Sequence, residues 1–192
     1  MFAGPPNADS ELSRWRQYLL LLARLQLGPP RQGKPDASDV VQQTMIDAVR
    51  QRGHFRGTSE LEWAAWLRRI LACNLADAFR TLHRQKRDAD RLQSIESALD
   101  RSSASLGSFL AASLSSPSIR AGRIEQLAAV ATALERLPDA QREVLVLHYL
   151  ESWPLDRISG HLNRSPTAVA GLLKRGLKQL RTLLTPTGSE GS

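Results

Sequence analysis

The sequence predicts an all-α protein of two small helical domains joined by a flexible linker, the C-terminal domain being a helix-turn-helix. Apolar residues recur at helical spacings of three and four along most of the 192 residues. Residues 101–122 are rich in Ser, Ala and Gly and carry little charge, a composition that buries little and orders poorly. Residues 155–184 contain a short amphipathic segment, a turn and a second helix. We therefore expect domains at residues 10–92 and 123–186, with the linker at 93–122.

The first two helices are expected near residues 10–27 and from Ser38 to about Arg52. Apolar residues at helical spacing define the first helix, and Gly28, followed by two prolines, ends it. Ser38 is predicted to cap the second helix, and Asp39 stands in its first turn, where the helix dipole favours an acid. The residues expected on the exposed side of the second helix are Asp39, Gln42, Gln43 and Asp47.

The stretch from Trp63 to Leu82 gives the strongest helical signal in the chain. One of its faces is apolar at spacings of three and four, and the opposite face is basic. The apolar face is expected to lie in the core of the first domain. The basic residues expected to point outward, from this helix and just beyond it, are Arg68, Arg69, Arg80, Arg84, Lys86, Arg87 and Arg91.

A glycine-flanked loop before this helix exposes an aromatic residue, Phe55. Beside a basic helix this ring can stack on an unpaired base, as aromatic residues do in proteins that hold single strands. Equally, the ring can close over the core of the domain. Glu60 and Glu62 follow in the loop and are interpreted as paired surface acids.

Two prolines divide the beginning of the C-terminal domain. A helix from about Ile124 ends before Pro138, and a second helix from Asp139 ends before Pro154. The short segment that follows is amphipathic and leads into the last turn. We therefore expect this domain to consist of helices joined by short connections.

The final helix has a well-defined start. Ser165 is a favourable N-cap, and Pro166 occupies the first helical position, where its missing N–H costs nothing. Asn163 tolerates the left-handed conformation that a tight turn between helices requires. The inner face is predicted to contain Val169, Leu172, Leu173, Leu180 and Leu184, and the outer face Thr167, Ala168, Gly171, Lys174, Arg175 and Lys178.

Basic charge is concentrated in two parts of the chain. The formal net charge of +7 and the pI near 10.5 favour a polyanionic partner, nucleic acid first and a membrane surface second. Residues 63–91 carry seven basic residues against three acids, and residues 163–186 carry five basic residues and no acid. A basic helix after a turn is typical of a helix-turn-helix that binds DNA. The alternative is an ordinary pair of antiparallel helices.

Neither a membrane span nor a targeting segment is evident. The longest apolar run, Leu19 to Ala23, is far shorter than the roughly 20 residues that a membrane span needs. The first residues lack a basic stretch followed by an apolar one. The single cysteine, Cys73, cannot form an internal disulfide, which fits a reducing compartment. We therefore expect a cytoplasmic protein without membrane insertion.

The sequence favours a binding protein over an enzyme. His54, His83, His148 and His161 lack the pairwise spacing of a metal site, and the sequence contains no phosphate-binding, dinucleotide-binding or nucleophile-elbow motif. We expect no catalytic residue, metal or cofactor. One alternative is a DNA-binding regulator whose N-terminal domain dimerises or receives a signal. Another is a protein that only holds a second protein, against which the charge at residues 163–186 argues.

Two blocks of the sequence stand in the order found in a known family. The first block contains DASDVVQQTMIDAV, HFRG, AAWLRRIL and NLADAFR. The second block is LERLPDAQREVLVLHYLESWPLDRISGHLNRSPTAVAGLLKRGLKQLRTLL. With these blocks the chain resembles the extracytoplasmic-function sigma factors, the small two-domain members of the bacterial sigma-seventy family. The resemblance covers nearly everything outside the N-terminal tail, the linker and the last few residues.

This resemblance implies a promoter-specificity subunit that is not itself a catalyst. Such a subunit joins bacterial core RNA polymerase, contacts two promoter elements and helps to open the duplex. The first block is similar to the domain that binds core polymerase and recognises the minus-ten element. The second block is similar to the helix-turn-helix domain that recognises the minus-thirty-five element. The implied partners are core RNA polymerase and promoter DNA, and an anti-sigma protein is a further candidate.

The resemblance also implies roles for particular residues. The helix similar to the one that docks on the clamp helices of the polymerase contains Asp39, Val41, Gln42 and Thr44. The elements similar to those that melt the minus-ten region and hold its non-template strand contain Phe55, Arg56, Asn74, Asp77, Arg80 and Arg84. The implied contacts of the final helix with DNA come from Ser165, Thr167, Lys174, Arg175 and Lys178.

The final helix departs from the family pattern at one place. Ala170, Gly171 and Leu172 stand where the family commonly presents polar or basic residues just after the valine. The remaining contacts are therefore expected to be made mostly to phosphates. Phosphate contacts would make binding sensitive to salt and largely independent of sequence.

Overall fold

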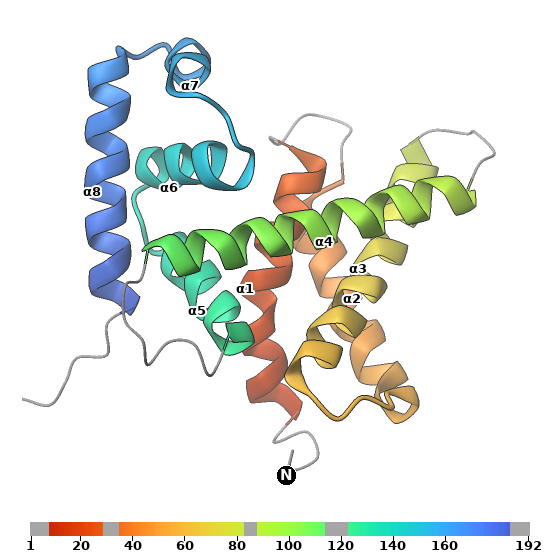
Figure 1. Cartoon of the computed structure of the whole chain (residues 1–192). Coiled ribbons are helices and arrows are strands. Elements are labelled where there is room, and N and C mark those ends of the chain that lie inside the picture. Colours follow the sequence, from red (N-terminus) through yellow and green to blue (C-terminus); the bar gives the residue numbers. More distant parts are fainter. Residues whose placement is uncertain (1–7, 29–34, 83–87, 114–122, 185–192) are drawn as a thin grey trace, which may run out of the picture. The chain divides into compact units, whose positions relative to one another are not determined.

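The computed structural model describes residues 8–28, 35–82, 88–113 and 123–184, and every regular element in these residues is helical (Figure 1). A 3-10 turn, η1 (Arg52–His54), and a π-helical turn, η3 (Val146–Leu150), accompany the α-helices. The all-α prediction is confirmed. In the part of the chain that is described, no helix is both long and apolar enough to cross a membrane. The α-helices are α1 (Ala8–Leu27), α2 (Ala37–Gln51), α3 (Glu60–Leu82), α4 (Asp88–Ser113), α5 (Arg123–Glu135), α6 (Asp139–Leu145), α7 (Leu155–Leu162) and α8 (Pro166–Leu184).

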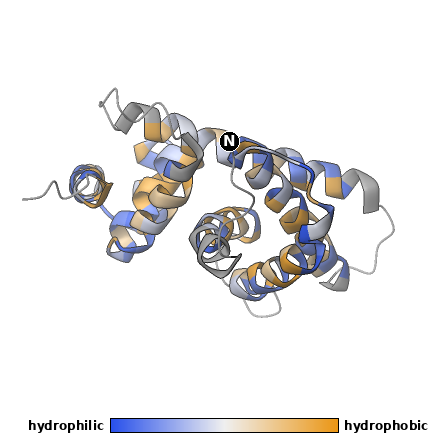
Figure 2. Ribbon diagram, turned by 90° about the horizontal axis from the view of Figure 1, so that it is seen from below, coloured by the Kyte–Doolittle hydropathy of each residue, from blue (hydrophilic) through white to orange (hydrophobic). Residues whose placement is uncertain are grey.

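The chain divides into two compact units, residues 1–104 and 105–192, with the boundary inside α4. In the N-terminal unit, α1, α2 and α3 pack against one another. Trp15, Tyr18 and Leu71 are fully buried there. Figure 2 shows that apolar residues gather on one side of individual helices, with hydrophilic residues on the other. Burial of these apolar faces is the main force that holds each unit together.

The start of α2 differs from the prediction. α1 ends at Leu27, as expected, but α2 begins at Ala37 and is capped by Asp36, not by Ser38. Asp36 Oδ1 accepts the backbone amide of Ser38 at 2.6 Å. The Ser38 hydroxyl accepts a hydrogen bond from the Arg16 guanidinium at 3.2 Å. Because the N-cap lies two residues earlier than predicted, a carboxylate satisfies an amide of the first turn, and a charged acceptor makes the stronger bond.

The start of α3 also corrects an expectation. Glu60 and Glu62 lie in the first turn of this helix, not in a loop. Glu62 Oε2 accepts the amides of Thr58 at 2.8 Å and Ser59 at 3.0 Å, and Ser59 Oγ accepts the amide of Glu62 at 3.3 Å. This is a capping box, and its S-x-x-E signature is legible in the sequence. The Thr58 amide, followed by the hydroxyl and amide of Ser59, lowers the pKa of the Glu62 carboxyl below its ordinary value.

The linker expected at residues 93–122 is helical over its described part. α4 continues to Ser113, and residues 114–122 lie outside the described residues. The Ser-rich and Ala-rich composition predicted little burial, but over the described residues a few large apolar side chains are enough to bury one face of a helix. The buried residues of this face are Ile95, Leu99, Leu106, Phe109 and Leu110.

Arg68 was expected on the outer basic face of α3 but lies inside the N-terminal unit. Its side chain is 14% exposed, and its guanidinium donates to Asp100 Oδ1 at 2.9 Å and to the Tyr18 hydroxyl at 3.2 Å. The Tyr18 hydroxyl donates in turn to Ser103 Oγ at 2.9 Å. Burial by itself lowers the pKa of the guanidinium, but Tyr18 and Asp100 outweigh it and the pKa is raised. The network ties α1 and α3 to α4.

The C-terminal unit contains the predicted short connections. Pro138 separates α5 from α6, and Pro154 is the N-cap of α7. The π-helical turn η3 is followed by Ser152 with a φ of 56°, and the Trp153 amide then bonds to the Leu147 carbonyl at 2.9 Å. This turn directs the chain from α6 into α7. The hydrophobic core around which these helices pack contains Val144, Ile158, Val169 and Leu172.

Candidate nucleic-acid interface

The turn between α7 and α8 has the conformation that the sequence predicts. Asn163 caps α7 with φ 50° and ψ 48°, a left-handed conformation that Asn adopts more readily than most residues. The amide of Arg164 then bonds to the Ser159 carbonyl at 3.0 Å. Ser165 Oγ accepts the amide of Ala168 at 3.2 Å, as an N-cap should. Pro166 is the first residue of α8.

A shared core holds α8 against α7 and α6. Val169 and Ile158 are completely buried, and Leu172 is 8% exposed. The three side chains pack with Val144 of α6. The outer face of α8 is therefore carried on a rigid support, which a helix that enters a DNA groove needs.

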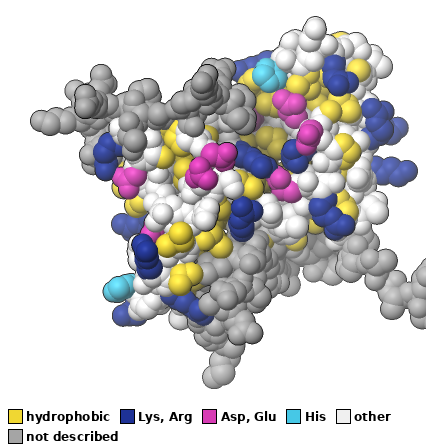
Figure 3. Space-filling view, turned by 180° about the vertical axis from the view of Figure 1, so that it is seen from behind, with side chains coloured by type: hydrophobic (Ala, Val, Ile, Leu, Met, Phe, Trp, Pro, Cys, Tyr) yellow, Lys and Arg dark blue, Asp and Glu magenta, His cyan; other side chains and the backbone are white. Residues whose placement is uncertain are grey.

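The outer face of α8 is basic. Thr167, Lys174, Arg175 and Lys178 are all exposed, and Figure 3 shows Lys and Arg side chains projecting along this helix. None of these three cations is ion-paired with an acid among the described residues. Unpaired cations on one helix face are available for phosphate groups. The residues predicted for this surface from the sequence are therefore brought together.

Two further arginines of the same unit were missing from the predicted set. Arg164 is exposed in the turn directly before the cap of α8. It belongs to the basic cluster at residues 163–186, so the sequence contained the signal. Arg157 of α7 is exposed, and its guanidinium lies 3.6 Å from the centre of the Trp153 ring. No sequence pattern pointed to this cation–π contact, because it depends on the turn that places Trp153 beside α7.

On α2, the structure divides the four residues predicted to contact polymerase. Asp39 and Gln42 are exposed. Val41 and Thr44 are completely buried, so their side chains lie in the core of the unit and not on the exposed side of α2. They lie three residues apart on the face of α2 that packs into the unit. Thr44 Oγ1 also donates to the Val40 carbonyl at 2.8 Å.

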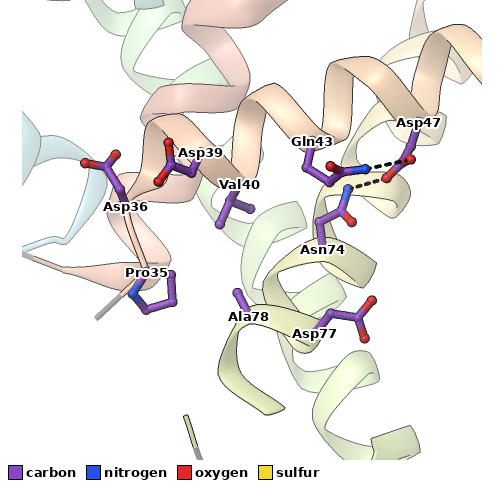
Figure 4. A pocket seen from close by; sticks show the side chains of 9 residues that line it. All are labelled: Pro35, Asp36, Asp39, Val40, Gln43, Asp47, Asn74, Asp77 and Ala78. Carbon is purple, nitrogen blue, oxygen red and sulfur yellow. Dashed lines mark hydrogen bonds between the residues drawn. The ribbon is translucent and has the colours of Figure 1, made fainter. Parts of the chain in front are cut away.

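Asn74 and Asp77 lie beside a groove between α2 and α3 (Figure 4). Asn74 Nδ2 donates to Thr44 Oγ1 at 3.2 Å and to Asp47 Oδ2 at 3.1 Å, so Asn74 connects the two helices. Asp77 Oδ1 accepts from Arg80 at 2.8 Å. The groove has a volume of about 550 Å³ and is acidic rather than basic. Its carboxylates belong to Asp36, Asp39, Asp47 and Asp77.

Phe55 belongs to an aromatic cluster. Its ring centre lies 4.9 Å from that of Trp63 and 5.4 Å from that of Trp66. A Cβ atom at Gly57 would overlap the Phe55 ring, so this glycine permits the close approach. The sequence allowed the Phe55 ring either to stack on an unpaired base or to close over the domain core. In the structure the ring packs on the domain and stays partly exposed. Arg56 is exposed, and its guanidinium donates to the Gly53 carbonyl at 2.8 Å.

Of the last two arginines in the predicted set, the structure describes Arg80 but not Arg84. Arg80 is exposed on α3 and forms its ion pair with Asp77 one turn earlier. Arg84 lies outside the described residues. Of the basic face predicted for this region, Arg69 is exposed and Arg68 is not. Among the described residues of α3, the exposed positive charge is therefore smaller than the sequence suggested.

The fold and this interface together define a helix-turn-helix DNA-binding protein. A family model described as "Sigma-70, region 4" matches residues 127–180, which include the whole of α6, α7 and the connecting turns. The chain is 30% identical over 149 residues to RNA polymerase sigma factor CarQ of Myxococcus xanthus, and the match covers 77% of this chain and 74% of that protein. The chain therefore belongs to the sigma-70 family, as a sigma factor of the extracytoplasmic-function type.

Membership of this family gives the chain a role in transcription. Sigma factors are non-catalytic initiation factors, and their partners are RNA polymerase and promoter DNA. The matched region coincides with the helix-turn-helix and its supporting helices.

Proposed function

We propose that this chain directs core RNA polymerase to specific promoters and assists in opening the promoter duplex. The observation that carries the proposal is the helix-turn-helix of the C-terminal unit, in which a packed core supports an exposed face with the cations Lys174, Arg175 and Lys178. In this proposal the C-terminal unit binds the minus-thirty-five element. The N-terminal unit binds core polymerase and the minus-ten element.

The outer face of α8 supplies the contacts to the minus-thirty-five element. Thr167 and Lys174 lie about two turns apart on one side of the helix, Lys178 lies one turn beyond Lys174, and Arg175 lies beside this row, about 80° around the helix axis from Thr167. The Thr167 amide and the Ser165 hydroxyl lie at the start of α8, where the helix dipole favours a phosphate. The lysines reach phosphates and set the register of the helix on the duplex.

In the N-terminal unit, the exposed side of α2 is the proposed surface for core polymerase. Asp39 and Gln42 project from this side, and the neighbouring groove carries further carboxylates. This negative charge would complement a basic partner surface and repel a DNA phosphate. Val41 and Thr44 contribute indirectly, because they hold α2 in place from the core.

For the minus-ten element, the proposed contacts are Phe55, Arg56 and Arg80. The partly exposed ring of Phe55 can receive an unpaired base, and the two arginines are exposed and can attract the backbone of a single strand. Asn74 and Asp77 have supporting roles in this proposal. Asn74 joins α2 to α3, and Asp77 positions Arg80 through its ion pair.

The proposal is tested by transcription with purified core RNA polymerase on a pool of fragments of the source genome, followed by mapping of RNA 5′ ends. With the chain added, RNA should start at a limited set of positions that share two sequence blocks upstream. Core polymerase alone should give no such set. Identical start positions with and without the chain would refute a promoter-directing role, whereas duplex binding without directed initiation would leave only a DNA-binding protein.

A further inference from the structure

The three glycines of α7 and α8 have different surroundings. A Cβ atom added at Gly160 in α7 would meet nothing within 4 Å. One added at Gly176 would lie 3.0 Å from a methyl carbon of Leu145, inside the core. At Gly171 the three nearest atoms all belong to the guanidinium of Arg175, with Nη1 at 3.3 Å, Nη2 at 3.7 Å and Cζ at 3.8 Å. Gly171 therefore faces neither open space nor the core.

The contact shows where Arg175 carries its charge. Long side chains on an α-helix point back toward the N-terminus, over the preceding turn. The Arg175 side chain does so, and its guanidinium occupies the surface that a side chain at Gly171 would otherwise cover. The positive charge therefore lies about one turn closer to the N-terminus of α8 than the Cα atom of Arg175 does. That end of the second helix is the part of a helix-turn-helix that approaches the bases.

Gly171 is also an unfavourable residue for helix stability. A glycine inside a helix is less stable than alanine, because it loses more backbone freedom on folding. Neither tight backbone packing nor a positive φ requires glycine at this position. The neighbouring Ala170 is exposed and supplies no polar group to this part of the surface. In the structure, the absence of a side chain at Gly171 leaves room for the guanidinium of Arg175.

We propose that Gly171 is a positioning residue, which seats the Arg175 guanidinium on the N-terminal half of the DNA-facing surface of α8. The inference rests on the proposed binding of DNA by α8. A methyl group at position 171 displaces the Arg175 guanidinium from its position beside the helix. Arg175 then contacts the DNA phosphates in a less favourable geometry. Displacing this one flexible side chain changes the folding stability of the free protein little. It weakens the complex with DNA, because the charge of Arg175 is no longer where the phosphates need it.

The test is Gly171→Ala in the full chain, with two measurements. Unfolding by urea should show equal or higher stability, because alanine favours the helix. Fluorescence anisotropy with a labelled random-sequence duplex of about three helical turns should show a dissociation constant about threefold higher, the effect of a strained rotamer. Gly160→Ala is the matched control, since it makes the same change in open space. It should raise stability in the same way and leave the dissociation constant unchanged.

A double-mutant cycle with Arg175→Ala assigns the effect. Arg175→Ala should weaken binding and reduce the slope of log K against log salt by about 0.9, the value for one phosphate contact. Gly171→Ala should add nothing when Arg175 is absent. If Arg175→Ala changes neither the dissociation constant nor the salt slope, Arg175 does not contact DNA as proposed. If it weakens binding while Gly171→Ala does not, or if Gly171→Ala acts equally without Arg175, only the seating role is overturned.

Discussion

Replacement of Ile158 by alanine tests how firmly α8 depends on α7. Ile158 is completely buried and packs with Val144, Val169 and Leu172. The substitution removes three buried carbon atoms, and at about 0.8 kcal/mol each this loses about 2.4 kcal/mol of transfer free energy. The cavity left in the core adds to this loss, so we expect the free energy of unfolding to fall by about 3 kcal/mol.

Hydrogen exchange of the backbone amides of α7 and α8 measures this loss locally in the full chain. A change of about 3 kcal/mol corresponds to a decrease in protection of about 150-fold. Ile158→Val is the graded control, because it removes a single methylene and should cost about 1 kcal/mol, or roughly fivefold. If Ile158→Ala lowers the protection of α8 no more than Ile158→Val does, the shared core does not hold α8, and our account of the interface is refuted.

Three further variants test separate features. Ser152→Gly relieves the left-handed φ of 56° and should raise the free energy of unfolding by about 0.5 kcal/mol in urea denaturation, and a lower midpoint would contradict this. The folded state lowers the pKa of the Glu62 carboxyl, so the carboxylate stabilises the fold at pH values above the pKa that Glu62 has in the unfolded chain. This stabilisation is lost as the pH falls through the pKa of Glu62 in the folded state. Glu62→Gln should therefore lower the thermal midpoint at neutral pH and flatten its decline in acid, whereas parallel pH curves would exclude the capping role. Asp39→Ala with Gln42→Ala should reduce co-purification with core polymerase at unchanged stability, since both side chains are exposed, and undiminished association would remove α2 from the proposed interface.

The DNA-facing unit was predictable at the level of single residues. Asn163, Ser165 and Pro166 occupy the positions that the sequence assigned to them, and the basic residues that follow lie on the exposed face of α8. These features depend on backbone conformation and capping within a few residues, so a linear sequence contains the information. The S-x-x-E box from Ser59 to Glu62 was equally local, and it shows that such a signal can also be overlooked.

The N-terminal site was less predictable, because its residues act through distant partners. Thr44 and Asn74, from α2 and α3, are joined by a hydrogen bond across 30 residues of sequence. Arg68 meets Tyr18 and Asp100 in the same way. Helical periodicity indicates that a face exists, but it does not distinguish a polar residue that bonds inside the unit from one that faces a partner.

By itself, the sequence determined the helical class, the ends of most helices, the helix-turn-helix and the concentration of positive charge on its last helix. Each follows from local physics, namely apolar spacing, capping groups, prolines and unpaired cations. Only the tertiary structure decided that residues 93–113 form a helix, that Val41 and Thr44 are buried, and that Phe55 packs on two tryptophans. The contact between Gly171 and the Arg175 guanidinium is likewise visible only in the structure. The reason is that burial and contact are properties of pairs of elements, and the pairing exists only once the chain has folded.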